Sequence, residues 1–175
     1  MSRNNLIALS NEIRIFSALL LKFFNQGLEE RLKANGESIN SMQYGILQMV
    51  RSETLTISIL SQRTGMDPSS LVRSIDTLER KGLIKRGSDP KDRRRNPLHI
   101  TEKGSDLLNQ VPAISETDLS FQAIQSIGSD SANEVREQLA SLIRQFPEGK
   151  MVTNMMDQLP PMSLKNETSE NVNND

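Results

Sequence analysis

The sequence contains no cysteine and no tryptophan, and only one histidine and one tyrosine. Without cysteine, the chain can form no disulfide and can carry no thiol-based redox sensor. A single histidine, His99, argues against a transition-metal site built from histidine and cysteine, and is better explained as structural or exposed. No nucleophile–base pairing and no glycine-rich phosphate loop is present. We therefore expect neither catalysis nor a bound metal or cofactor.

Long hydrophobic runs are also absent. The longest, around residues 18–21, is interrupted by Lys22 and falls far short of a membrane span. The N-terminal sequence MSRNNLIAL lacks the long apolar core and the small-residue cleavage site of a signal peptide. These absences lead us to expect a soluble cytoplasmic protein that has no membrane partner.

The formal net charge is −1, but the charges are segregated along the chain. Residues 80–103 contain nine cations and three carboxylates, a net charge of +6, so that the remaining residues carry −7. The local field, rather than the net charge, governs how a protein meets a polyanion. This basic segment therefore makes nucleic acid a candidate partner.

Apolar periodicity predicts a mainly helical chain, with helices over about 5–35, 41–50, 58–64, 68–81, 101–111, 119–127 and 133–146. The first has a stripe wider than one packing partner needs, which favours a subunit interface over a core helix of a monomer. Leu55-Thr56 suggests a brief strand. Pro112 should kink or break its helix, Gly128 marks a turn with residues 129–131, and Pro147 and Gly149 stop the last helix. Residues 151–159 could form a short helix, and residues 165–175 read as disordered.

The helices at 58–64 and 68–81 are joined by Thr64-Gly65-Met66, which predicts a helix-turn-helix. Asp67 suits the N-cap of the second helix, and Pro68 its first position. Its outward face is expected to present short hydroxyls around one arginine, with no carboxylate: Ser69, Ser70, Arg73, Ser74 and Thr77. Such a face can enter a major groove, with Arg73 on base edges. The alternative is an ordinary solvated face.

Strand-like segments at 83–86 and 97–100 flank a turn-rich tip at 87–95, which predicts a basic β-hairpin. Asp89-Pro90 initiates the turn, and four cations follow: Lys91, Arg93, Arg94 and Arg95. Arginine suits a narrow minor groove because its planar fork donates in fixed directions. Asp92 would repel DNA unless it orients a neighbour, so we assign it the role of holding Arg94 extended. The alternative is a solvated run of charges.

The predicted fold is mainly α with a small β-wing: a winged helix-turn-helix flanked by N- and C-terminal dimerisation helices. At this point the chain resembles the MarR family (multiple antibiotic resistance regulators). DPSSLVRSIDTLERKGLIKR is similar to that family's recognition helix and first wing strand, and DPKDRRRNPLHITEKG to its wing and following helix. The pattern extends from about residue 5 to residue 146. We expect a dimerisation helix at 1–36, the winged domain at 37–100, further dimerisation helices at 101–147 and a polar tail, at least partly disordered, at 148–175.

The resemblance implies an obligate homodimer that binds pseudo-palindromic double-stranded DNA and usually represses transcription. Ser69, Ser70 and Arg73 match its major-groove positions, and Asp92 and Arg94 its Asp-x-Arg wing motif. Many such proteins release DNA when a small, often aromatic, acid binds near the junction with the DNA-binding domain. Separately from the resemblance, we expect a cleft between the first, second and fifth predicted helices that could hold a small anion, with Arg14 or Tyr44 as polar contacts that match no family motif. Pro97 departs from the pattern, because it removes a strand amide donor and should shorten or fray that strand.

Two further hypotheses compete with a DNA-binding regulator. A winged-helix module that has lost specific DNA binding would present the basic tip to an acidic protein surface. An enzyme that dimerises through this domain is disfavoured, because the chain has no room for a catalytic domain. Steep salt dependence of duplex binding would favour DNA over the protein–protein module.

Overall fold

The computed structural model describes residues 2–88, 96–147 and 149–158. The chain divides into two compact units, Met1–Glu134 and Val135–Asp175. In the described part of the chain, no helix is both long and apolar enough to cross a membrane. The expected domain boundaries stay a prediction.

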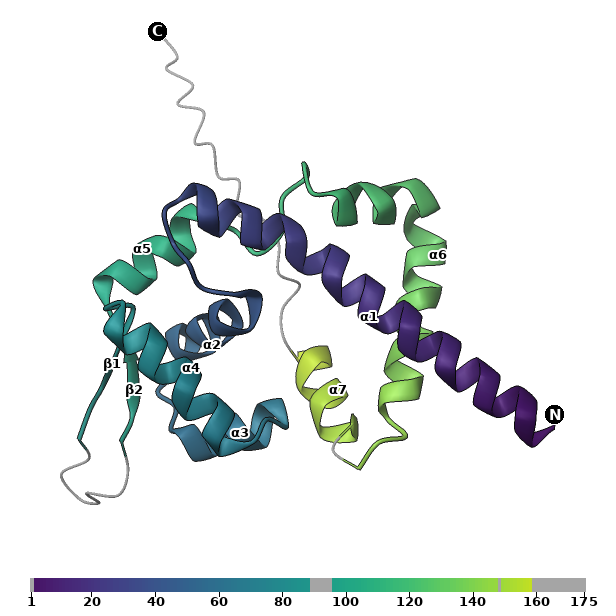
Figure 1. The fold of residues 1–175 in the computed structure, drawn as a ribbon, viewed down its shortest axis with the longest axis horizontal. Coiled ribbons are helices and arrows are strands. Elements are labelled where there is room, and N and C mark those ends of the chain that lie inside the picture. Colours follow the sequence, from purple (N-terminus) through teal and green to yellow (C-terminus); the bar gives the residue numbers. More distant parts are fainter. Residues whose placement is uncertain (1, 89–95, 148, 159–175) are drawn as a thin grey trace, which may run out of the picture. The chain divides into compact units, whose positions relative to one another are not determined.

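The fold is mainly helical with a small two-stranded sheet, as the sequence predicted (Figure 1). In chain order the elements are α1 (Arg3–Ala34), α2 (Ser41–Ser52), α3 (Ile57–Thr64), α4 (Pro68–Arg80), β1 (Ile84–Arg86), β2 (Leu98–Ile100), α5 (Glu102–Gln110), α6 (Leu119–Ile143) and α7 (Gly149–Gln158). Within the first unit, α2, α3, α4 and the hairpin gather at one end of α1 (Figure 1). This cluster is the winged helix-turn-helix.

Local signals explain the helix-turn-helix. Thr56 caps α3 by accepting a hydrogen bond from the backbone of Ile59, and Gly65 ends it in the left-handed region at φ 66°. Asp67 then caps α4, and Pro68 occupies its first turn. Since a residue with a side chain is strained at positive φ, glycine allows the tight change of direction between the two helices. The predicted turn at Gly65 and the predicted N-cap at Asp67 are confirmed.

The hairpin strands are antiparallel, with Ile84 opposite Ile100, Lys85 opposite His99 and Arg86 opposite Leu98. The expected strand at Leu55-Thr56 is a single bridge, in which the Leu98 N–H donates to the Leu55 carbonyl at 2.7 Å. Pro97 precedes β2, and its carbonyl still accepts the Gly87 N–H at 2.7 Å. The strand is therefore shortened by one residue, as its missing amide donor predicted.

The core of the winged domain is formed by aliphatic side chains from every one of its elements. Six of these are fully shielded from solvent: Leu47, Leu60, Leu71, Ile75, Leu78 and Leu98. They come from α2, α3, α4 and β2, so the hydrophobic effect acts on all of these elements at once. Burial of α4 at spacings of three and four residues confirms its predicted packing face.

Only the C-terminal end of α1 joins this core, through Leu28 and Leu32. There the guanidinium of Arg31 forms an ion pair with Asp118, which is 6% exposed, and donates to the carbonyls of Pro112 at 3.1 Å and Ala113 at 3.0 Å. A Cβ on Gly27 would lie 2.4 Å from an Asp118 carboxylate oxygen, so glycine is needed for this close approach. Arg31 thus fastens the segment after α5 to the end of α1.

Of three expectations for the C-terminal half, one is confirmed and two need adjustment. Pro112 does break its helix: α5 ends at Gln110. Gly128, at φ 80°, interrupts α6, but residues 129–131 are helical rather than part of a turn. The last predicted helix ends at Ile143 instead of Phe146, because the backbone tightens into three-residue turns, such as Phe146 N–H to Ile143 carbonyl at 3.0 Å.

Gly149 was expected to stop a helix, and the structure shows instead that it begins α7. The reason is close packing. A Cβ on Gly149 would lie 1.7 Å from the carbonyl oxygen of Ile143, so only glycine lets α7 start against the end of α6. The short helix expected over 151–159 is confirmed with an earlier start. Residues 165–175, expected to be disordered, lie outside the described residues.

A matched pair of glycine substitutions tests the junction between α5 and the hairpin. A Cβ on buried Gly104 would lie 2.2 Å from the Leu83 carbonyl oxygen and 2.9 Å from Ile100 Cγ1. We expect Gly104→Ala to lower the free energy of unfolding by about 1–3 kcal/mol, because α5 must move away from β1. Urea denaturation followed by circular dichroism measures this change.

Gly45→Ala in α2 is the control, since a Cβ there meets nothing within 4 Å. A helical alanine at this position should raise the free energy of unfolding by roughly 0.5–1 kcal/mol. Equal effects of the two substitutions would contradict the close approach at Gly104.

Candidate nucleic-acid interface

The outward face of α4 carries both signs of charge. Ser69, Val72, Arg73, Asp76 and Arg80 are exposed, and Ser70 and Thr77 are half-buried. Successive helical residues are about 100° apart, which places Asp76 on the same face as Arg73 and Arg80, about 60° and 40° around the helix from them. The expectation that no carboxylate lies among the outward residues was therefore wrong.

Ser74 also departs from its expected place. It is 5% exposed and belongs to the buried side of α4 together with Leu71, Ile75 and Leu78. Its hydroxyl donates to the Ser70 carbonyl at 3.1 Å, one helical turn back, so that the buried group is satisfied. We correct the prediction that Ser74 faces outward.

The N-terminus of α4 is held by Asp67. Its carboxylate accepts hydrogen bonds from the Ser69 hydroxyl and, at 2.9 Å, from the Ser70 N–H. Hydrogen bonds from Ser69 and Ser70 to the charged form hold the pKa of Asp67 well below its usual range. The two serines that were expected to face a duplex thus also order the first turn of the helix.

Arg73 lies one turn further along the same face. Its guanidinium reaches the Ser70 hydroxyl at 3.5 Å, the outer limit of a hydrogen bond, and the residue is exposed. Thr77 donates its hydroxyl to the Arg73 carbonyl at 3.0 Å and accepts from Arg80 at 3.2 Å. Four of the predicted residues therefore share one face of α4: Ser69, Ser70, Arg73 and Thr77. Among the described residues, the guanidinium of Arg73 is held there only by its long contact with the Ser70 hydroxyl.

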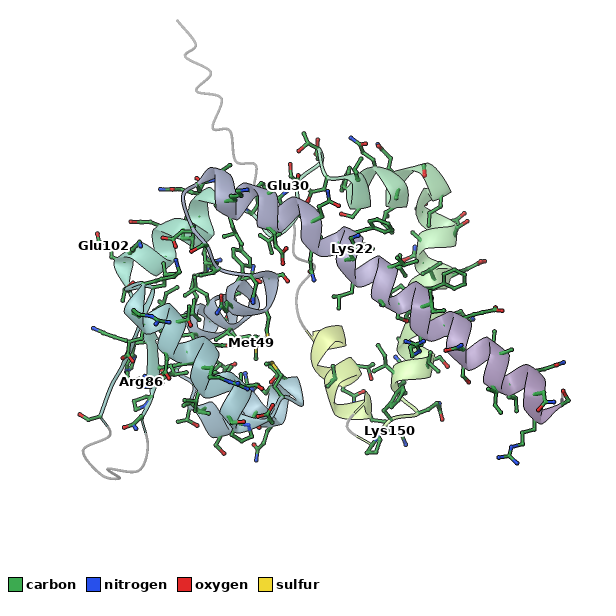
Figure 2. All side chains as sticks on the ribbon, in the orientation of Figure 1. Lys22, Glu30, Met49, Arg86, Glu102 and Lys150 are labelled. Atoms are coloured by element: carbon green, nitrogen blue, oxygen red, sulfur yellow. The ribbon has the colours of Figure 1, made fainter. Side chains whose placement is uncertain are left out.

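The structure adds a polar cluster that sequence reasoning missed. Arg86, the last residue of β1, forms ion pairs with Asp76, at 2.5 Å, and with Glu79, both on α4. The Arg86 backbone N–H also donates to Glu79 at 3.0 Å. Figure 2 shows Arg86 at the hairpin beside α4. The spacing of three between Asp76 and Glu79 puts both carboxylates on one side of the helix, which was the available signal.

A second cluster involves Glu37, in the loop between α1 and α2. Lys103 approaches its carboxylate at 2.8 Å and Lys81 at 3.4 Å. Burial raises the pKa of Glu37, but the hydrogen bonds and positive charges of Lys103 and Lys81 outweigh it, so that the pKa lies below its ordinary value. Of the five cations in residues 80–103 that the structure describes, Lys81, Arg86 and Lys103 are thus paired with carboxylates outside that segment.

The remaining predicted site residues are in the hairpin tip. Lys91, Asp92, Arg93, Arg94 and Arg95 lie outside the described residues, so their roles stay predictions. The base of the hairpin is described and closely packed: a Cβ on Gly87 would lie 2.8 Å from His99 Nε2. His99 is therefore a packing residue at the root of the wing, which agrees with its expected structural role.

The two polar contacts considered for an effector have other partners. Tyr44 is 2% exposed and donates its hydroxyl to the Val111 carbonyl at 2.5 Å; burial raises its pKa. Arg14 donates to Asn11 on its own helix. A pocket of about 300 Å³ lies instead between the second half of α1 and the start of α6, with Phe23, Arg31 and Leu119 in its wall. Tyr44 is thus a core residue.

The helix-turn-helix followed by a two-stranded wing defines this protein as a winged helix-turn-helix protein. Residues 38–95, from the loop before α2 to the wing tip, match the sequence profile described as the MarR family. This segment of the chain is therefore similar to the MarR family, as the resemblance predicted. This is a family of DNA-binding transcription regulators and not of enzymes.

Among sequence relatives, the chain is similar to a protein of Thauera aromatica assigned as the transcriptional regulatory protein for the hcr operon. The two are 37% identical over 89 residues, which is 50% of this chain and 54% of the relative. The chain thus matches about half the length of this relative.

Solved structures share the fold over most of the chain. A MarR-family transcriptional regulator from Rhodococcus sp. RHA1 is 25% identical, with a TM-score of 0.61, covering 79% of this chain and 97% of that one. A mutant MarR from E. coli complexed with operator DNA is 21% identical, with a TM-score of 0.64, covering 80% and 96%. The second likeness shows the fold alone.

The cap of α4 predicts a pH dependence of stability. Because the folded pKa of Asp67 is depressed, its contribution is fully present above the ordinary pKa of about 3.9 and is lost as the pH falls through the lower folded value. We expect Asp67→Asn to be less stable than the wild type at pH 7, with the difference shrinking below about pH 4. Urea denaturation from pH 7 to pH 2.5 measures it; a difference independent of pH would contradict the assignment.

Proposed function

We propose that the protein is a homodimeric, sequence-specific DNA-binding transcriptional regulator of the repressor type, acting on double-stranded DNA. The observation that carries the proposal is the position of the outward face of α4 beside a hairpin whose tip contains four cations. Duplex DNA presents a groove of helix width next to phosphates, which suits a helix flanked by a basic wing. The family assignment of residues 38–95 supports the same function.

In this proposal α4 enters the major groove. Arg73 donates to base edges, while Ser69, Ser70 and Thr77 approach the backbone closely because their side chains are short. Ser74, being buried, supports the helix and makes no contact with DNA. The tip cations Lys91, Arg93, Arg94 and Arg95 meet the adjacent minor groove and phosphates, with Asp92 orienting Arg94.

The dimer is proposed from the apolar surface of α1. Ten large apolar side chains of this helix are exposed in the single chain: Leu6, Ile7, Leu9, Ile15, Phe16, Leu19, Leu20, Leu21, Phe23 and Phe24. A continuous apolar surface of this kind marks an association site. A two-fold dimer would present two copies of α4 to half-sites about one helical turn, roughly 34 Å, apart on a pseudo-palindromic operator.

Release by a small-molecule effector stays a prediction. The pocket at Arg31 and Asp118 lies where α1 meets the segment after α5, so a ligand there would act on the connection between the winged domain and the rest of the first unit. Its wall combines apolar side chains with charged ones, as expected of sites for small organic molecules.

Binding to DNA is tested by fluorescence anisotropy on a duplex from the upstream region of the protein's own gene, with a scrambled duplex and a series of salt concentrations. We expect Arg73→Ala to weaken specific binding by about 1–3 kcal/mol per half-site, through loss of base contacts. Arg51→Ala is the matched control, because Arg51 is an exposed arginine on α2 that bonds to Asn109.

Equal losses in the two variants would contradict the assigned face of α4. If the wild type binds neither that duplex nor a selection of genomic fragments at low salt, the protein–protein module replaces the proposed function.

Association is tested by sedimentation equilibrium. Phe16 is 61% exposed on the apolar surface of α1, and a charge there could not be desolvated in an interface. We expect Phe16→Glu to shift the dimer to monomer at micromolar concentration, whereas Lys22→Glu, a charge change about 120° around the same helix, should leave it dimeric. A monomeric wild type would refute the proposed assembly.

A further inference from the structure

Arg86 links the two parts of the proposed DNA interface. Its guanidinium contacts Asp76 and Glu79 on α4, and its backbone N–H contacts Glu79 as well, so helix and strand are joined through three polar contacts. Side chains alternate along a strand, which puts Arg86 on the same side of β1 as buried Ile84, while Lys85 is exposed on the other side. The strand therefore presents Arg86, and not Lys85, to the helix.

The position of Arg86 in the chain gives this link its leverage. It is the last residue of β1 and lies opposite Leu98, the first residue of β2. The sequence between these two residues carries the cations that are proposed to reach the minor groove. The contacts of Arg86 with α4 therefore set the direction in which the chain leaves β1 toward them.

Asp76 gives the link an electrostatic role. Its carboxylate is on the outward face of α4, near Arg73 and Arg80, and its side chain is 53% exposed. An unpaired carboxylate there would repel the phosphates of an approaching duplex. Nη2 of Arg86 pairs with Asp76 and compensates this charge. The other terminal nitrogen of its guanidinium, Nη1, pairs with Glu79.

We propose that Arg86 is a positioning residue of the DNA interface, which neutralises Asp76 and fixes the wing against α4. The inference rests on the proposed function. Arg86 acts through Asp76 and Glu79, since its guanidinium is directed to these carboxylates and its side chain is only 26% exposed. The competing role, a direct contact of Arg86 with phosphate, predicts a different response to a second substitution.

Anisotropy with the operator duplex tests the electrostatic role through a double-mutant cycle. We expect Arg86→Ala to weaken binding by at least about tenfold, and Lys85→Ala, which removes the neighbouring exposed cation, by no more than about threefold. Asp76→Asn should change the affinity of the wild type by less than about twofold, but strengthen binding of Arg86→Ala by about fivefold or more, because the exposed carboxylate then has no partner.

An equal factor for Asp76→Asn in both backgrounds would overturn the proposal in favour of a direct phosphate contact. So would equal losses in Arg86→Ala and Lys85→Ala. Arg86→Lys guards against misfolding: it keeps the charge but loses the fork to two carboxylates, and we expect an affinity between those of the wild type and Arg86→Ala. Thermal melting of each variant identifies any that do not fold.

A second measurement needs no DNA. Because the chain has no cysteine, spin labels can be placed at Ser88→Cys, beyond β1, and Val72→Cys, on the exposed face of α4. Labelled protein is diluted with unlabelled protein, so that distances within one subunit dominate. We expect Arg86→Ala to shift or broaden the distance distribution and Lys85→Ala to leave it unchanged.

An unchanged distribution in Arg86→Ala would overturn the positioning role whatever the protein binds. Conversely, a broadened distribution in a protein that binds no duplex would contradict the proposed function, while the link between wing and helix would stand.

Discussion

The winged domain depends on one short strand that is bonded on both sides. Leu98 lies opposite Arg86 of β1 on one side and donates its N–H to Leu55, just before α3, on the other. Its side chain is fully buried between these elements. Through Leu98, the entrance to the helix-turn-helix and the root of the wing are parts of one hydrogen-bonded and packed unit, which sets where the outward face of α4 lies relative to the hairpin.

Around this unit, several cations form ion pairs with carboxylates instead of adding up to one positively charged surface. Lys81, Arg86 and Lys103 contact carboxylates from other elements, so that they fasten the domain together and contribute less to its outward field. Near α4 and the hairpin, the described cations on exposed positions whose charge remains available to a polyanion are Arg73, Arg80 and Lys85. A count of charges along the sequence therefore overstates the field, because it cannot distinguish a cation in an ion pair from one that faces solvent.

Sequence reasoning succeeded where the determining contacts are local. The N-cap Asp67 and the turn glycine Gly65 act within a few residues, so the two helices that they join were predicted almost to the residue. It failed where a contact joins distant segments or where helical phase decides. Ser74 was expected to face outward but is buried, and Asp76 adds a carboxylate to the outward face, because the rotation of about 100° per residue decides the side on which each lies. Gly149 and Arg86 depend on close approach to other elements, which periodicity does not reveal.

The apolar surface of α1 is left uncovered in the single chain. The end of α1 that carries Leu28, Arg31 and Leu32 is covered, whereas side chains from Leu6 to Phe24 remain exposed to water. If a second copy covers them, association and folding share one free energy, and stability depends on protein concentration. Arg31 connects the covered end of α1 to the segment after α5. Burial of the rest of α1 would therefore also stabilise the position of this segment, next to the winged domain. The dimer would then do more than double the number of contacts with DNA: without it, the winged domain would not be held in place to bind DNA.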